Sequence, residues 1–330
     1  MESKKFKILV VGVMVITLSC ITLWSEKMYG QEKYPSKPIE VVIPFSAGGP
    51  TDVWTRIVAD ELSKDLGVPI SILYKPGAGG VTGTVYITTR KPDGYTLLAA
   101  TGSFISAPQF EKVPHYDVLK DFTPIAECVT IPMVLLSHTS SNLTSFDAML
   151  KLAKEKPGEL TCATAGVGTT AHLVVEVFKM HGVDFTHVPM KGGAVSITSL
   201  LGKHVNLILA FPSHAIPHVR SGDVRFLATT DKILGYPGVP TFKEKGLPEC
   251  DIFSSWQGFF GPGNLPKPIR DQLANSLQKV IQIPSVVKAL ENAGFSVEYR
   301  GPDELEKKVA NDYKDIEKVV KAAGLGKYAK

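Results

Sequence analysis

The sequence predicts an α/β protein made of two lobes, and three features lead to this expectation. The chain has 330 residues, a length typical of about two domains. Short β-rich runs alternate with amphipathic helical runs, the order expected when helices cover a mainly parallel sheet. A long β-rich stretch near residues 124–137 interrupts the alternation, which then begins again, so we expect two sheets.

The first half opens with an apolar run over residues 39–43, which predicts a strand. In residues 51–66 the apolar side chains Trp54, Val58 and Leu62 recur at helical spacing and predict a helix. Further along this half we expect a strand over residues 69–73, a helix over 81–90 and a strand over 95–99.

The second half repeats this order and is followed by a helical region. Its expected strands cover residues 160–164, 185–188, 205–209 and 224–229. Its expected helices cover residues 169–181, 194–201 and 212–221, and three more follow over residues 267–281, 285–293 and 302–323. The last of these has a typical helix start, with Pro302 followed by Asp303 and Glu304.

The chain is expected to cross between the lobes twice, near residues 126–129 and 227–230, and these crossings would form a hinge. Lobe one is then discontinuous and comprises residues 31–126 and 228–330. Lobe two comprises residues 127–227.

Residues 1–30 have the layout of an export signal. Lys4, Lys5 and Lys7 form a positive start, and the 17 residues from Ile8 to Trp24 are almost all apolar. We therefore expect a periplasmic protein whose remaining chain is soluble. Two alternatives stay open: the apolar run could serve as an N-terminal membrane anchor, and Cys20 could carry a lipid.

Composition and motifs argue against nucleic-acid binding and against several catalytic classes. The formal charge of +4 is small and dispersed. The sequence contains no G-x-S-x-G, H-E-x-x-H or C-x-x-C motif. His214 and His218 lack a visible third ligand, so we interpret them as surface histidines and expect no metal. Cys128, Cys162 and Cys250 are odd in number and cannot all pair within one chain.

Four glycine-rich turns carry the functional signal, each between an expected strand and an expected helix. They are Pro44-Phe45-Ser46-Ala47-Gly48-Gly49, Gly77-Ala78-Gly79-Gly80, Gly166-Val167-Gly168-Thr169-Thr170 and Lys191-Gly192-Gly193. A helix N-terminus presents unpaired N–H groups and partial positive charge, and glycine lets a ligand approach the backbone. Such turns predict a carboxylate or phosphate site, the alternative being that the glycines only form tight turns. The second turn departs from the dinucleotide fingerprint, so we expect no cofactor.

The candidate ligand-binding residues lie in these turns or near them. They are Phe45, Ser46, Ala47, Gly48, Gly49, Asp52, Gly79, Gly80, Thr101, Ser103, Gly168, Thr169, Thr170, His172, Lys191, Ala210 and Phe211. Asp52 could instead be only a helix-start residue, Lys191 a solvated charge and His172 a satisfied core histidine.

Taken together, the turns resemble those of the Bug family of extracytoplasmic solute receptors, which serve tripartite tricarboxylate transporters. The resemblance covers nearly the whole chain after residue 33 and rests on the order and spacing of the motifs. These motifs are Tyr34-Pro35-Ser36-Lys37-Pro38-Ile39, Pro44-Phe45-Ser46-Ala47-Gly48-Gly49 with Asp52 and Arg56, Pro76-Gly77-Ala78-Gly79-Gly80, Lys91-Pro92-Asp93-Gly94-Tyr95-Thr96-Leu97, Gly166-Val167-Gly168-Thr169 with His172-Leu173, Lys191-Gly192, and Pro217-His218 with Gly222.

The resemblance implies a type II periplasmic-binding-protein fold, a Venus flytrap with a cleft between its lobes. It implies a binding protein, not an enzyme, that captures a small organic acid and delivers it to two integral membrane transporter subunits. One carboxylate would be held largely by backbone N–H groups near residues 46–49, 79–80 and 168–170. We expect the receptor to be a monomer.

The sequence departs from the family pattern where the far end of the ligand would lie. Met190 replaces the usual Tyr, and residues 206–211 lack the usual Asp. An ammonium group would therefore have no counter-ion, so we expect no amino-acid ligand. Met190, Phe45, Ala210 and Phe211 could form an apolar wall suited to an aromatic or otherwise weakly polar acid.

Two alternatives from other classes remain open. A secreted hydrolase or lyase would need a nucleophile–base pair, which only Ser46, Ser103 or Thr170 beside His172 could supply. A ligand sensor without transport would bind its ligand but need no membrane subunits.

Overall fold

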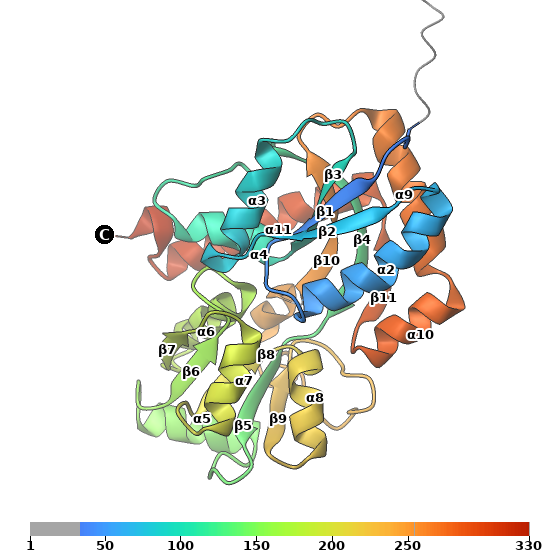
Figure 1. The fold of residues 1–330 in the computed structure, drawn as a ribbon. Helices are drawn as coiled ribbons and strands as arrows, with labels where there is room; N and C mark the ends of the chain where they lie inside the picture. Colours follow the sequence, from blue (N-terminus) through green and yellow to red (C-terminus); the bar gives the residue numbers. More distant parts are fainter. Residues whose placement is uncertain (1–33, 254, 330) are drawn as a thin grey trace, which may run out of the picture. The chain divides into compact units, whose positions relative to one another are not determined.

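The computed structural model describes residues 34–253 and 255–329. Within it, Lys37–Lys330 forms one unit that contains two β-sheets and the helices that cover them (Figure 1). The expected export signal and Cys20 lie outside the described residues. Among the helices of the described part of the chain, none has the length and apolar character that crossing a membrane requires.

The first lobe is built on a six-stranded sheet with the spatial order β11-β4-β10-β3-β1-β2. Its strands are β1 (Ile39–Ile43), β2 (Ile70–Tyr74), β3 (Thr96–Thr101), β4 (Phe122–Ile131), β10 (Ser255–Pro262) and β11 (Ser296–Arg300). Its helices are α2 (Pro50–Leu66), α3 (Val81–Thr88), α4 (Ser103–Ser106), α9 (Lys267–Ile281), α10 (Pro284–Asn292) and α11 (Pro302–Ala322), with short 3-10 turns η1 (Ala78–Gly80), η2 (Ala107–Phe110) and η4 (Gly326–Tyr328).

The second lobe is built on a five-stranded sheet with the spatial order β7-β6-β8-β5-β9. Its strands are β5 (Val134–His138), β6 (Thr161–Thr164), β7 (Thr186–Pro189), β8 (Leu207–Ala210) and β9 (Val224–Thr229). Its helices are α5 (Phe146–Glu155), α6 (Thr170–Met180), α7 (Gly193–Leu201) and α8 (Pro212–Arg220), and the 3-10 turn η3 (Pro248–Phe253) follows before the chain re-enters the first sheet.

The sheets are mixed, which corrects the expectation that each is mainly parallel. In the first sheet β1 is parallel to both β2 and β3, and in the second sheet β6 is parallel to both β7 and β8. All other strand pairs described are antiparallel. In the first sheet, β4 carries the chain out of the lobe and β10 carries it back, so these two neighbours run in opposite directions.

Strand β10, together with β11, was not anticipated from the sequence, although β10 lies inside the first sheet. Its sequence, SWQGFFGP, contains Gly258, Gly261 and Pro262, which are typical of turns. The structure explains one of these glycines, because a Cβ at Gly258 would lie 2.2 Å from the carbonyl oxygen of Ala126 on β4. A glycine that permits close strand packing therefore concealed a central strand.

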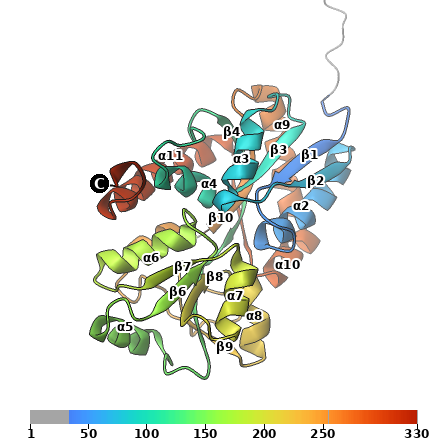
Figure 2. The same cartoon turned by 60° about the vertical axis from the view of Figure 1, so that its left-hand side comes forward.

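Alternating side chains on the second sheet pack against different helices. Leu135 and Leu209 belong to the core cluster on the side of α5 and α6. Leu136 and Ile208 belong to the cluster on the side of α7 and α8 (Figure 2). This alternation follows from the two-residue period of a strand and buries both faces of the sheet.

A large core cluster joins the two lobes. It contains Phe104 from the first lobe and Phe178 from α6 of the second lobe, together with Val319 and Val320 near the end of α11. Helix α11 also contacts α6 directly. The lobes therefore share a packed apolar contact at α6 and α11.

Candidate functional site

The turn between β1 and α2 is held by the carboxylate of Asp52. Oδ2 accepts the N–H of Gly48 at 2.8 Å. Oδ1 accepts the hydroxyl of Tyr74 at 2.7 Å and Nε of Arg56 at 2.8 Å. The carboxylate thus binds its own turn, and the neighbouring residues Ser46 and Ala47 are exposed.

The charge of Asp52 is stabilised by these partners. Burial by itself would raise the pKa of Asp52, but the Gly48 N–H, the Tyr74 hydroxyl and Arg56 together lower it below its usual value. The side chain is only 7% exposed. An ionised carboxylate that is already saturated with donors suits a structural role better than direct contact with an anionic ligand.

The second turn packs against the first. Gly79 and Gly80 have φ values of 65° and 103°, which residues with a Cβ rarely adopt. The ring of Phe45 lies over Gly80, where a Cβ would be 3.1 Å from Cζ of that ring. On its other side the turn approaches the second lobe, because a Cβ at Gly79 would lie 3.1 Å from the carbonyl oxygen of Val167.

Thr101 and Ser103 lie buried at the end of β3, where the two lobes meet. The hydroxyl of Thr101 accepts the N–H of Ser103 at 3.3 Å. Between them, Gly102 faces Thr170 of the second lobe, since a Cβ at Gly102 would lie 2.9 Å from Cγ2 of Thr170. Three groups of candidate residues therefore come together at this interface.

In the turn before α6, Gly168 forms hydrogen bonds with residues of both lobes. Its N–H donates to Nδ1 of His172 at 3.3 Å, and its carbonyl oxygen accepts the hydroxyl of Ser106 from the first lobe at 2.7 Å. Thr169 caps α6: its hydroxyl accepts the N–H of His172 and donates to the carbonyl oxygen of Gly166. Gly168 has a φ of 77°, and a Cβ there would lie 3.2 Å from Cα of Ala107.

His172 is enclosed by protein groups. Nε2 lies 3.4 Å from Oε1 of Glu176, and the ring stacks on His187 with centroids 4.1 Å apart. Phe110 covers another side of the ring at 4.8 Å between centroids. Both ring nitrogens are therefore occupied, which matches the interpretation of His172 as a satisfied histidine.

The turn before α7 lies against the start of α8. Lys191 is exposed, and Gly193 lies under the ring of His214, where a Cβ would be 2.8 Å from Cε1. Nδ1 of His214 and the hydroxyl of Ser213 are buried without a hydrogen-bond partner among the described residues. Burial lowers the pKa of His214, so its ring is neutral at pH 7. His214 is half-buried, so it is not the fully exposed histidine that the sequence suggested, and the adjacent Gly192-Gly193 pair is the signal that could have indicated the contact.

The four residues of the expected apolar wall lie in different packing environments. Ala210 belongs to the cluster on the side of α7 and α8, and Met190 packs against it. Phe211 packs against the large shared cluster, and Phe45 lies on Gly80. The wall stays a prediction.

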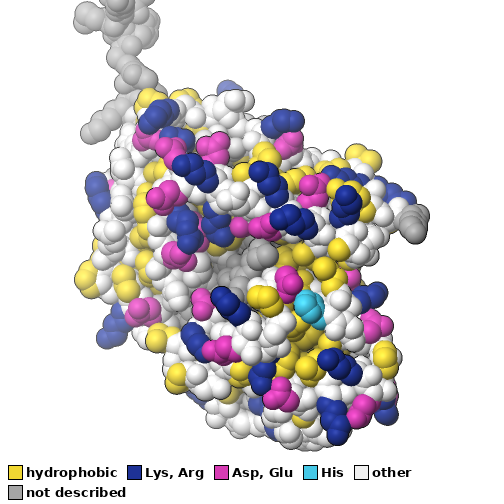
Figure 3. All heavy atoms as spheres, turned by 180° about the vertical axis from the view of Figure 1, so that it is seen from behind, with side chains coloured by type: hydrophobic (Ala, Val, Ile, Leu, Met, Phe, Trp, Pro, Cys, Tyr) yellow, Lys and Arg dark blue, Asp and Glu magenta, His cyan; other side chains and the backbone are white. Residues whose placement is uncertain are grey.

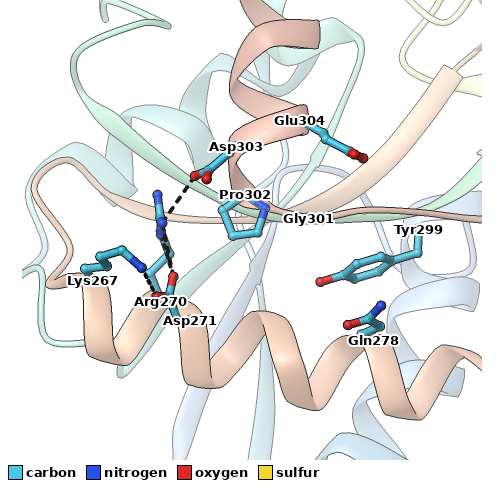
Figure 4. Close-up of a pocket in the computed structure, with 9 residues that line it drawn as sticks. All are labelled: Lys267, Arg270, Asp271, Gln278, Tyr299, Gly301, Pro302, Asp303 and Glu304. Carbon is cyan, nitrogen blue, oxygen red and sulfur yellow. Dashed lines mark hydrogen bonds and ion pairs between the residues drawn. The ribbon is translucent and has the colours of Figure 1, made fainter.

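A separate hollow of about 420 Å³ lies on the first lobe between α9 and the start of α11 (Figure 4). Its charged groups pair with one another: Arg270 lies 3.0 Å from Asp271 and 3.3 Å from Asp303, and Lys267 also pairs with Asp271. None of the four glycine-rich turns lines this hollow. It is not a candidate for the predicted site.

Three further observations concern the sequence expectations on metals, cysteines and charge. No group of three or more His, Cys, Asp or Glu suited to a metal occurs in the described part of the chain. Cys128, Cys162 and Cys250 are buried free thiols. On the face shown in Figure 3, basic and acidic side chains are interspersed and neither gathers into a patch.

Comparison with known proteins identifies the family. The family model described as "Tripartite tricarboxylate transporter family receptor" (TctC) matches residues 54–325. The chain is 32% identical over 298 residues to Protein BugT of Bordetella pertussis, which covers 89% of this chain and 91% of BugT.

Solved structures agree with this match. The periplasmic binding protein BugD superposes with a TM-score of 0.80 at 30% identity, covering 89% of this chain and 99% of BugD. The R. palustris protein Rpa4515, solved with adipate, gives a TM-score of 0.81 at 28% identity, covering 89% of this chain and 99% of that protein. The predicted two-lobed periplasmic-binding-protein fold and the Bug resemblance are thereby confirmed. The chain belongs to the TctC family, the receptors of the tripartite tricarboxylate transporter family.

Proposed function

We propose that this protein captures a small organic acid between its lobes, outside the cytoplasmic membrane, and delivers it to a transporter with two integral membrane subunits. The observation that carries the proposal is the meeting of a glycine-rich turn from each lobe, at Gly79 with Val167, beside the contact of Gly102 at the end of β3 with Thr170. Family membership and the adipate bound by the R. palustris relative support an acid as ligand. The receptor would act as a monomer.

Backbone N–H groups at the helix starts are the proposed carboxylate donors. Those of Gly48 and Gly168 already bind Asp52 and His172. Within the described residues, the N–H groups of Thr51 and Thr170 have no protein acceptor. They open α2 and α6, where the helix dipole favours an anion.

The proposed motion is closure about the two segments that link the sheets. The expected lobe boundaries near residues 126–129 and 227–230 (31–126 and 228–330 in lobe one, 127–227 in lobe two) lie a few residues before these links, since β4 stays in the first sheet to Ile131 and β9 stays in the second to Thr229. The linking segments are hydrogen-bonded to each other: Met133 N donates to the Thr230 hydroxyl at 2.8 Å, and Thr230 N donates to the Met133 carbonyl at 2.9 Å. A ligand that contacts both lobes stabilises the closed state through those contacts.

A hydrolase would need a nucleophile beside His172. The hydroxyls of Ser46, Ser103 and Thr170 are not among the hydrogen-bond partners of the His172 ring within the described residues. We therefore propose binding without catalysis, and recovery of unchanged acid after long incubation is the expected result.

A thermal-shift screen with carboxylic acids and their neutral amides tests the proposal. The panel should contain aliphatic dicarboxylates, aromatic acids, aspartate and glutamate. An acid at about a thousand times its Kd adds about 4 kcal/mol of apparent stability, and its amide should add none. If amides stabilise as well as acids, the carboxylate assignment fails; if aspartate or glutamate surpasses every aromatic acid, the expected weakly polar ligand is wrong.

A further inference from the structure

The two turns that open α2 and α6 share one structural device. In each, the N–H of a glycine donates to a side chain four residues later in the first turn of the helix: Gly48 to Asp52, and Gly168 to His172. We propose that His172 is a positioning residue, whose imidazole holds the turn at residues 166–170 in the shape that receives the acid without touching the acid. This inference rests on the proposed function and adds the device that prepares its second-lobe half.

The hydrogen bond from Gly168 assigns one tautomer to His172. Nδ1 must be unprotonated to accept the Gly168 N–H at 3.3 Å. The proton of the neutral ring then lies on Nε2, which faces Oε1 of Glu176 at 3.4 Å. A protonated ring would lose its acceptor, so the tether to Gly168 needs the neutral Nε2–H form.

A second imidazole supports the other end of the turn. His187 stacks on His172 with an interplanar angle of 13°. Its Nε2 lies 2.7 Å from the hydroxyl of Thr164, which also accepts the N–H of Gly166 at 3.3 Å. Burial, aided by the neighbouring His172, lowers the pKa of His187 to about 4 and keeps this ring neutral at pH 7. The stacked pair therefore connects to both Gly166 and Gly168.

The same turn is also aligned from the first lobe. The Ser106 hydroxyl binds the carbonyl oxygen of Gly168, and a Cβ at Gly168 would crowd Cα of Ala107 at 3.2 Å. With its N–H fixed by His172 and its carbonyl oxygen fixed by Ser106, Gly168 has little freedom to rotate. The N–H of Thr170, two residues later, is thereby presented in a fixed direction at the helix start.

Three variants separate a positioning role from simple core packing. His172→Asn keeps an oxygen acceptor near the position of Nδ1, His172→Gln keeps a polar group near Nε2, and His172→Phe keeps only the ring. The expected result is rescue by Asn alone. In the unliganded protein, hydrogen exchange of the Gly168 amide should stay slow in wild type and His172→Asn and become at least about tenfold faster in His172→Gln and His172→Phe.

Adipate is the probe for the binding half of the test. We expect His172→Asn to bind adipate within about threefold of wild type, and the other two variants to bind it at least about tenfold more weakly. Nitrogen-15 spectra of the wild-type His172 ring should show the Nε2–H tautomer. The inference is overturned if the ring is the Nδ1–H tautomer, if Gly168 exchanges equally in all variants, or if His172→Phe binds like wild type.

Failure of the inference can be told apart from failure of the proposed function. Absence of adipate binding to the wild-type protein would count against adipate as a ligand, while exchange at Gly168 and the ring tautomer would still decide whether His172 positions the turn. Normal wild-type binding with unchanged affinity in His172→Phe would overturn the positioning role alone.

Discussion

The turns before α2 and α6 are each fixed by a glycine N–H that binds a side chain four residues later, but the acceptor groups differ. In the first lobe the acceptor is the charged carboxylate of Asp52, which is also bound by Arg56 and Tyr74 of the same lobe. In the second lobe the acceptor is the neutral ring of His172, and the turn it holds is also bound by Ser106 of the first lobe. The turn before α2 is therefore held entirely by residues of its own lobe. The turn before α6 is also held by Ser106 of the other lobe. We expect changes at the first turn to affect stability most and changes at the second to affect ligand affinity most.

The largest expected difference is between Gly168→Ala and Gly48→Ala. Both glycines have positive φ, so each alanine should cost about 1–2 kcal/mol of stability. Only Gly168 faces the other lobe, because a Cβ at Gly48 meets nothing within 4 Å. Affinity for the acid found in the screen should fall about a hundredfold in Gly168→Ala and about tenfold or less in Gly48→Ala, measured by calorimetry.

Gly67→Ala provides the matched control for that pair. Gly67 ends α2 with a φ of 70° and open space around its Cβ position. It should lose stability like the other two variants and keep wild-type affinity. Equal affinities in Gly168→Ala and Gly48→Ala would remove the contrast between the turns.

Replacing Asp52 tests the first tether. Asp52→Ala leaves the Gly48 N–H, the Tyr74 hydroxyl and Arg56 without their acceptor, so it should lower the free energy of unfolding by about 2–3 kcal/mol, and Asp52→Asn by about 1 kcal/mol. Urea unfolding at pH 7 measures both. Because the pKa of Asp52 is lowered, its contribution is present above the usual pKa of 3.8 and is lost as pH falls through the folded value. Asp52→Asn should remove that acid-dependent loss, and a variant that keeps it would show that another carboxyl causes it.

Replacing His187 tests the second imidazole that supports the turn before α6, and it does so in a different pH range. The ring takes up a proton near pH 6.5 when unfolded but near pH 4 when folded, so the unfolded state binds more protons between these values. The contribution of His187 to the free energy of unfolding is therefore fully present above pH 6.5 and is lost as pH drops toward 4. After allowance for partial solvent exposure, the loss should be about 1–2 kcal/mol, and His187→Gln should flatten it.

The control for His187 must account for Glu127, which titrates in an overlapping range. Burial raises the pKa of Glu127 to about 7, against the hydrogen bond and charge of Arg300. Its contribution therefore decreases as pH rises from about 4.5 to 7, opposite in sign to that of His187. The difference between wild type and His187→Gln cancels this contribution. If that difference is independent of pH, His187 does not differ in protonation between the folded and unfolded states.

The sequence predicted the positions of the two turns, because a glycine-rich run between an apolar strand and an amphipathic helix is a local signal. The tethers themselves were not predicted: Asp52 and His172 were named as candidate ligand-binding residues, and their bonds to Gly48 and Gly168 are visible only in the structure. The ring partners of His172 were not predictable in the same way, since His187 lies on a different strand and is brought close only by parallel pairing of β6 with β7. Ser106 is 62 residues from Gly168, and no periodic pattern connects them.

The fold shows the same division. Alternating apolar runs predicted most helices and strands of both lobes to within a few residues. Strand β10 was missed because its residues satisfy non-local requirements: Gly258 makes room for β4, and Gln257 accepts the indole N–H of Trp54 on α2. Contacts across the sheet, and between the lobes, depend on the assembled chain and leave little trace in local periodicity.

The smallest expected effect is the most direct test of contact between the lobes. Ser106→Ala removes the hydroxyl that binds the Gly168 carbonyl oxygen. This loss should destabilise the closed state by about 1 kcal/mol and weaken acid binding about fivefold. Because the bond joins the lobes, the loss should appear mainly as faster dissociation of the acid, since it destabilises only the closed state. Ser276→Ala, at a buried serine on α9, is the matched control and should leave dissociation unchanged. Suppose instead that both variants lose the same stability without ligand and that the dissociation rate does not change. The turn before α6 would then depend on its own lobe alone, as the turn before α2 does.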